Sequence, residues 1–164
     1  MTELKPQKRG GRIAMTAEER DLYLTQSRTC RVGTSNAAGD AHVSALWFVW
    51  LDGTLWLNSV VKSQRWTNLM RKPRISVLVD GGHDFMELQG VELVGAVEVI
   101  GEVPRVGEPN ALLEAPERAF GLKYANGDFA YDGGHAWLRL VPEKIVSWDF
   151  RKMASLMPPA GGSS

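Results

Sequence analysis

The chain has 164 residues, which is enough for one domain with an ordinary hydrophobic core but too few for two. Nineteen basic residues balance nineteen acidic ones, so the net charge gives no reason to expect binding to nucleic acid or to an anionic membrane surface. The single cysteine excludes an intrachain disulfide, and the lack of a secretory signal or of an apolar run near the ~20 residues of a membrane span predicts a cytoplasmic protein.

The first predicted element is a basic arm that leads into a helix. Residues 1–15 carry four basic side chains around a Gly-Gly pair and show no helical or strand period, so we expect a flexible arm. Thr16 and Glu19 have the spacing of a capping box, in which each residue satisfies a free backbone N–H of the other. This spacing predicts a helix over residues 17–26.

After this helix the pattern changes to short β-type segments separated by turn residues. Asp52-Gly53 is a strong signal for a two-residue hairpin turn, because glycine accepts the positive φ that such a turn needs. Gly90 and Gly95 are expected bulge points in one long or bent strand. The predicted elements are strands over 31–34, 42–51, 54–57, 74–80, 85–100, 135–141 and 144–148, and helices over 64–71 and 110–120, the second interrupted at Pro116.

Many antiparallel strands with short turns and only two or three helices predict a mainly β domain, folded as a closed or partly closed barrel. We expect a single such domain over residues 16–152. The Gly- and Asp-rich loop over 125–134 is long enough to cover a ligand. Residues 153–164, rich in Pro, Gly and Ser, are expected to form a disordered tail.

Polar and basic side chains gather where a predicted strand end meets a predicted helix start, over residues 57–69. Free backbone N–H groups and the positive end of the helix dipole favour an anion at such a place. The side chains of Ser59, Lys62, Ser63 and Arg65 add hydroxyl groups and positive charge. The segment therefore predicts a phosphate-binding site, with a capped and solvated surface helix as the alternative.

Three segments carry a resemblance to a known family: residues 39–44 (GDAHVS), residues 47–50 (WFVW) and the pattern S-x5-R-x2-N-L-x3-P over 59–73. Their order over roughly residues 16–150 resembles the pyridoxamine 5′-phosphate oxidase-like split β-barrels, and more narrowly their flavin/deazaflavin oxidoreductase branch. The chain departs from that branch by reversing the Asp-Gly of the first turn and by placing Arg65 where lysine is commoner. Arginine keeps the charge and adds a planar fork that binds phosphate through two hydrogen bonds.

The resemblance implies a cofactor site. It places Ser59 at the family's strand-end hydroxyl and Arg65 at its phosphate-binding basic position, with residues 44–46 beside the ring. Trp66 would lie beside the phosphate, but packing of its helix against the barrel explains this residue equally well. Trp148 and Lys152 would reach a partner subunit's cofactor, or they could belong to a frayed chain end. The full implied set is Ser44, Ala45, Leu46, Asn58, Ser59, Lys62, Ser63, Arg65, Trp66, Trp148 and Lys152.

Metal and catalytic residues are not indicated by any pattern. His42, His83 and His135 are too scattered for a metal motif, so we expect no metal. Cys30 is expected to pack at a strand start. The catalytic residues stay unassigned, because solvent, His42 or Lys152 could each deliver a proton.

The cofactor implied by the resemblance is coenzyme F-420 (8-hydroxy-5-deazaflavin), with FMN as the alternative. The oligoglutamate tail of F-420 needs positive charge, which the basic arm and the cluster Lys62, Arg65, Arg71, Lys72 and Arg74 supply. The implied function is hydride transfer from reduced deazaflavin to an electron-poor C=C or C=N bond of a small molecule. The alternatives are an FMN-binding oxidoreductase of the pyridoxamine phosphate oxidase type and a non-catalytic flavin or deazaflavin binding protein. A homodimer with the cofactor in the inter-subunit groove is expected.

Overall fold

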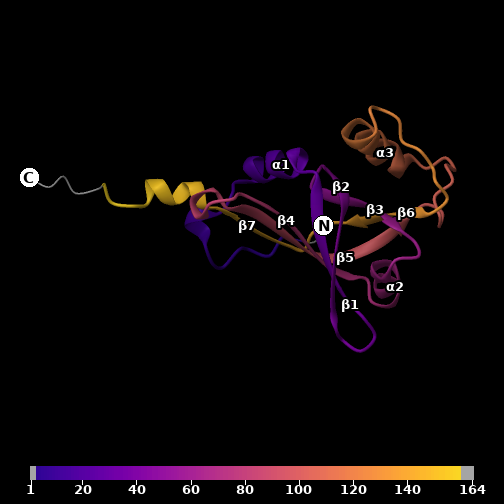
Figure 1. Ribbon diagram of the computed structural model, residues 1–164, viewed down its shortest axis with the longest axis horizontal. Coiled ribbons are helices and arrows are strands. Elements are labelled where there is room, and N and C mark those ends of the chain that lie inside the picture. The colour runs from indigo at the N-terminus through magenta and orange to yellow at the C-terminus, as the bar shows by residue number, and fades with distance from the viewer. Residues whose placement is uncertain (1–2, 160–164) are drawn as a thin grey trace, which may run out of the picture.

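The strands predicted from the sequence close into a barrel (Figure 1). The computed structural model describes residues 3–159. Its strands are β1 (Thr29–Ser35), β2 (Ala41–Leu51), β3 (Thr54–Val60), β4 (Arg74–Gly81), β5 (Gln89–Ile100), β6 (His135–Leu140) and β7 (Lys144–Asp149). Its α-helices are α1 (Ala17–Gln26), α2 (Gln64–Arg71) and α3 (Ala111–Tyr124), and short 3-10 helices cover Gly11–Ile13, Phe85–Glu87 and Phe150–Ser155.

Six strands form the barrel and the seventh is attached to it. The order of neighbours is β4-β1-β2-β3-β6-β5, and the pairing of β5 with β4 closes the ring. β7 pairs with the first half of β5, whose second half pairs with β6. Every one of these strand pairs is antiparallel. The prediction of a split β-barrel with a few short helices is therefore confirmed.

The hairpin turn at Asp52-Gly53 has the predicted form. Both residues have positive φ, 48° and 75°, which matches the twist of the two flanking strands. Leu51 pairs with Thr54 directly across the turn. This turn sets the register of β2 against β3, and both strands contribute to the cavity described below.

The predicted strand over 85–100 is shorter than expected, and its glycines are not bulges. Residues 85–87 form a 3-10 turn, because a capping box between Asp84 and Glu87 closes the chain there before the strand begins. The pairing of β5 with β4 is continuous past Gly90 and Gly95. These positions need glycine for a different reason: a Cβ at Gly90 would collide with the indole of Trp148, and one at Gly95 would crowd Leu140.

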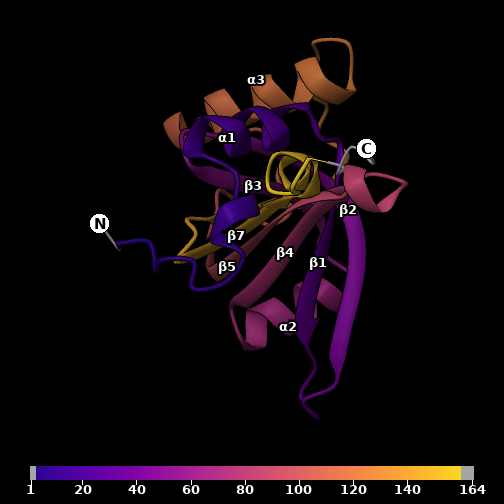
Figure 2. The ribbon, with the colours of Figure 1, turned by 90° about the vertical axis from the view of Figure 1, so that its left-hand side faces the viewer.

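Helix α3 runs further than predicted and is not interrupted at Pro116. The side chain of Asn110 caps it by accepting a hydrogen bond from the Leu112 N–H (3.0 Å), and the helix continues to Tyr124. Pro116 removes one backbone donor, but its ring is buried against the molecule. Packing thus outweighs the local preference against proline. The longer helix lies over the outer face of the barrel (Figures 1 and 2).

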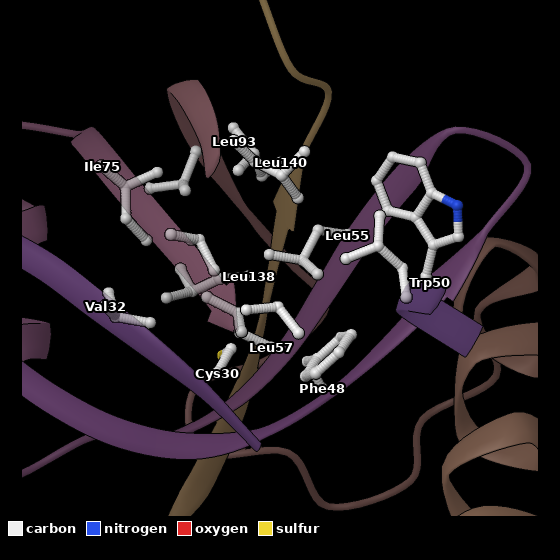
Figure 3. Packing of buried hydrophobic residues seen from close by; sticks show 14 of the residues in the cluster. Cys30, Val32, Phe48, Trp50, Leu55, Leu57, Ile75, Leu93, Leu138 and Leu140 are labelled. Atoms are coloured by element: carbon white, nitrogen blue, oxygen red, sulfur yellow. The ribbon is translucent and has the colours of Figure 1, made fainter. Parts of the chain in front are cut away.

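The interior of the barrel is filled by apolar side chains from all six of its strands (Figure 3). Cys30 is fully buried, as predicted, and burial raises the pKa of its thiol to about 12. A second apolar cluster lies beneath α3 and includes Trp56, Leu113 and Trp137. No helix in residues 3–159 is long and apolar enough to cross a membrane.

The N-terminal segment lies along β7. Lys5 donates its backbone N–H to the Glu143 carbonyl (2.9 Å), and the amide of Gln7 exchanges two hydrogen bonds with the backbone of Ser147. The flexibility expected of residues 1–15 stays a prediction. The expected tail over 153–164 begins inside the last 3-10 helix, and its final part, 160–164, lies outside the described residues.

Candidate functional site

A cavity of about 490 Å³ lies between the barrel wall and the loop that connects α3 to β6. Cavities of this size accommodate small-molecule ligands and cofactors. It is lined by Ala45, Leu46, Trp47, Asn58, Val60, Arg65, Phe120, Ala125, Asp128, Phe129, Ala130, Asp132 and His135. A second cavity of about 570 Å³ lies under the N-terminal arm and contains none of the predicted site residues.

Arg65 supplies the positive charge of the first cavity. The residue is only 6% exposed, and its Nη1 and Nε donate to the hydroxyls of Ser44 (2.6 Å) and Ser59 (3.1 Å). Within residues 3–159 no carboxylate lies within ion-pair distance of it. Burial lowers the pKa of Arg65, although arginine stays charged in proteins. A buried cation that meets only neutral hydroxyls is suited to an incoming anion.

Helix α2 fixes the position of Arg65. Ser63 caps the helix, since its Oγ accepts the N–H of Trp66 at 3.1 Å. One turn further on, Asn68 is buried and donates to Thr34 Oγ1 on β1 at 3.0 Å. The buried face of this short helix is therefore anchored to the barrel, and the guanidinium is held at the cavity without freedom to swing into solvent.

Asn58 adds an acceptor that has no donor. Its Oδ1 is buried and makes no hydrogen bond in the structure, and the residue lines the cavity. A buried acceptor without a partner is costly unless a ligand or water supplies the donor. The cavity thus combines a cation suited to an anionic group with an acceptor suited to an N–H group.

An aromatic wall closes one side of the cavity. The rings of Trp47 and Tyr124 are stacked, with centroids 4.4 Å apart and planes 6° apart, and Phe120 tilts against both. Burial raises the pKa of Tyr124 to about 12, and its hydroxyl donates to the Phe48 carbonyl at 2.8 Å. Trp47 itself is 48% exposed, so its ring offers surface to a flat ligand.

Two acidic side chains, Asp128 and Asp132, also line the cavity. Asp132 accepts the Gly134 N–H on Oδ1 (2.9 Å), and its Oδ2 lies 2.6 Å from Nδ1 of His135. The Gly134 N–H is the main cause that lowers the pKa of Asp132, and the nearby imidazole contributes in the same direction. Positive and negative groups therefore line one cavity.

A buried charge network supports the loop over 125–134. Tyr131 donates its hydroxyl to Glu117 Oε2 (2.9 Å), and Trp137 donates to Oε1 of the same carboxylate (3.2 Å). Arg105, which is 4% exposed, donates to Glu117 (2.6 Å) and to Glu102 (2.7 Å). The loop that lines the cavity is thus tied to α3 and to the segment after β5.

The structure brings together part of the predicted site. Four of the predicted residues, Ala45, Leu46, Asn58 and Arg65, line the cavity. Ser44 and Ser59 lie behind them and hold the guanidinium.

The other five predicted residues lie away from this lining. Ser63 serves as the helix cap, Lys62 is exposed beside it, and Trp66 is 7% exposed within the core. Trp148 packs over Gly90 on β5, and Lys152 donates to Glu19. Figure 1 shows β7 and the C-terminal turn at the end of the molecule away from α3. A cofactor contact for these residues stays a prediction.

Sequence reasoning missed the residues that the α3–β6 connection contributes. It identified the loop as a possible cover but assigned no role to Phe120, Phe129, Asp128, Asp132 or His135, all of which line the cavity. The available signal was the clustering of aromatic and acidic residues directly before a predicted strand. That signal does not say which strand face the loop covers, since this depends on the packing of α3.

Known proteins similar to this chain share its fold. The family model of pyridoxamine 5′-phosphate oxidase matches residues 15–149. A conserved hypothetical protein from Mycobacterium tuberculosis has a similar structure, with a TM-score of 0.76 and 26% identity over 96% of this chain and 98% of its own. An F-420 reductase (TM-score 0.56, 19% identity, 76% and 94% covered) and a haem storage protein from Vibrio cholerae (TM-score 0.64, 16% identity, 80% and 94% covered) share the fold. No curated protein matches the sequence.

Proposed function

Because the chain belongs to the pyridoxamine 5′-phosphate oxidase family, we propose that it is an oxidoreductase that binds coenzyme F-420 in the cavity between the barrel and the α3–β6 loop. The observation that carries this proposal is Arg65, a buried cation at the cavity without a carboxylate partner in residues 3–159. A phosphate would complete its coordination, and a ring N–H would satisfy Asn58.

Positive charge near α2 supports F-420 over FMN. Lys62 and Lys72 are exposed at the two ends of the helix, and Arg71 donates to the backbone carbonyls of Ser35 and Asn36 while staying exposed. Arg74 contributes less, because Glu143 neutralises it through two hydrogen bonds. Three cations therefore remain to attract the carboxylates of an oligoglutamate tail, which FMN lacks.

When bound, reduced F-420 supplies a hydride to an electron-poor C=C or C=N bond. The residues of this chain would orient the cofactor and shield the reacting groups from water. Arg65 holds the anionic part, the ring of Trp47 flanks the flat part, and the loop over 125–134 excludes water from one side. The physiological form that we propose is a cytoplasmic homodimer.

Exposed apolar side chains on β2 support the dimer. Val43 is 67% exposed and Trp47 is 48% exposed, and both project from the same face of the strand beside the cavity. A second subunit seated there would cover these side chains and close the open side of the cavity. Sedimentation equilibrium measures the expected mass of two chains.

The cofactor proposal is tested by titrating the protein with F-420 and with FMN while following cofactor fluorescence. We expect tighter binding of F-420, and a loss on the order of tenfold or more in Arg65→Ala, because the phosphate then loses both its cation and its hydrogen-bond donors. Arg118→Ala is the matched control, since Arg118 is exposed on α3. Preference for FMN would move the assignment to a flavin enzyme, and binding of neither would contradict the cofactor proposal.

A further inference from the structure

We propose that His135, whose Nδ1 lies against the carboxylate of Asp132, donates the proton that accompanies hydride transfer in the cavity. The inference rests on the function proposed above, because it needs a hydride donor bound in the same cavity. The sequence leaves the proton donor open among solvent, His42 and Lys152, whereas the structure separates these candidates.

A tight turn places the two side chains. Asp132 Oδ1 accepts the Gly134 N–H at 2.9 Å, so this carboxylate, three residues before β6, is fixed against the backbone at the start of the strand. Its Oδ2 lies 2.6 Å from Nδ1 of His135, the first residue of that strand. Since Nδ1 faces the carboxylate, Nε2 is the ring nitrogen that remains for a ligand in the cavity. The side chain of His135 is 34% exposed, so water can restore its proton.

The other candidate donors are placed elsewhere. Lys152 Nζ donates to the Ala14 carbonyl (2.9 Å) and to Glu19 Oε2 (2.6 Å), which holds the amine against α1. His42 is not among the residues that line the cavity. His135 is the histidine that lines it, and it is the one with a carboxylate in ion-pair contact among residues 3–159.

The proton step balances the hydride step. With an enone as the electron-poor C=C compound, hydride adds to the β-carbon, the C=C π pair forms the new bond between the α-carbon and the carbonyl carbon, and the C=O π pair moves onto oxygen, which gives an enolate. His135 Nε2 then releases its proton to the α-carbon, the C=O bond re-forms, and the nitrogen keeps the N–H electron pair. The substrate gains one hydride and one proton, the two electrons come from the reduced cofactor, and water reprotonates the imidazole.

A first test observes His135 without relying on turnover. Nitrogen-15 NMR of the histidine rings is recorded while the full chain is titrated with oxidised F-420. We expect the Nε2 resonance of His135 to shift as the cavity fills, and the resonances of His83, which is exposed outside the cavity, to stay in place. An unshifted His135 in the cofactor complex would overturn the proposal whether or not a substrate is reduced.

A second test measures single turnovers by stopped flow, with reduced F-420 and 2-cyclohexen-1-one as the probe. We expect His135→Gln to slow cofactor oxidation on the order of 100-fold with an unchanged cofactor dissociation constant, and His83→Gln to have no effect. Added imidazole should rescue His135→Ala. Asp132 is a positioning residue, so Asp132→Asn should lower the rate less and Asp132→Glu should restore part of it.

The outcomes separate the two proposals. If F-420 does not bind, the proposed function fails and the role of His135 fails with it. If F-420 binds and His135→Gln is as fast as the natural chain, the proton-donor role alone is overturned.

Discussion

Arg65 and Arg105 are both buried, with exposures of 6% and 4%, yet their surroundings are opposite. Arg105 donates to two carboxylates, Glu102 and Glu117, and to a backbone carbonyl. Arg65 donates to two serine hydroxyls. A buried arginine surrounded by carboxylates has its charge satisfied by the fold, whereas one that meets only neutral groups has it satisfied when a ligand arrives. The contrast distinguishes a structural charge from a binding charge.

The largest effect is expected from removing Arg105. In Arg105→Met the carboxylates of Glu102 and Glu117 would stay partly buried without their cation, which costs about 3–5 kcal/mol of the free energy of unfolding. Denaturant titration followed by tryptophan fluorescence measures this loss. Arg74→Ala is the matched control, because its ion pair with Glu143 is solvent-exposed and should contribute little to stability.

Arg65→Met, in contrast, should weaken ligand binding strongly and change stability little. It removes an uncompensated buried charge together with two hydrogen bonds to hydroxyls, so the free energy of unfolding is expected to change by no more than about 1 kcal/mol. Anion binding in the cavity should weaken on the order of 100-fold, because hydrogen bonds to charged groups are the strong ones. The same denaturant and cofactor titrations check both values. A destabilisation as large as that of Arg105→Met would contradict the distinction between the two arginines.

The fold could be predicted from the sequence because its signals are local. The capping box at Thr16 and the Asp52-Gly53 turn each act over a few residues, and the alternation of apolar residues gives the strands. The predictions were wrong where packing between residues far apart in the sequence determines the local conformation. Gly90 is glycine because of the Trp148 indole, and α3 passes through Pro116 because that ring is buried.

The candidate site could be predicted only in part, because only some of its residues lie close together in the sequence. Arg65 and Asn58 could be found, since they lie in one segment around a strand end and a helix start. Asp132 and His135 could not, because they lie about 70 residues further along and reach the cavity only through the packing of α3 and β6. Nor does the sequence reveal that Arg105, rather than Arg65, is paired with carboxylates.

Acid titration sharpens the contrast further. Burial opposes ionisation of Glu102, but the N–H groups around residues 106–108 and the Arg105 guanidinium outweigh it and lower its pKa from 4.5 to about 2. A carboxylate with a lowered pKa in the folded state contributes stability that is complete above pH 4.5 and is lost as the pH falls toward 2. We expect Glu102→Gln to be less stable at neutral pH and to lose less stability across this window.

Denaturation midpoints at a series of pH values test this expectation. Glu98→Gln is a suitable control, because Glu98 is largely exposed on β5. Equal losses of stability in the natural chain and in Glu102→Gln between pH 4.5 and 2 would show that the Arg105 network does not depend on this carboxylate.

The smallest effect on stability is expected from Tyr131, the residue that connects the Arg65 cavity with the Arg105 network. Tyr131 lies on the loop that forms one wall of the Arg65 cavity, and its hydroxyl donates to Glu117 in the Arg105 network. Tyr131→Phe removes one hydrogen bond from a carboxylate that still accepts from Arg105 and Trp137, so the loss of global stability should be only about 0.5–1 kcal/mol. Hydrogen exchange in residues 125–134 should nevertheless accelerate, because the loop loses its tie to α3. Unchanged exchange would mean that the satisfied charge network does not help to shape the binding cavity.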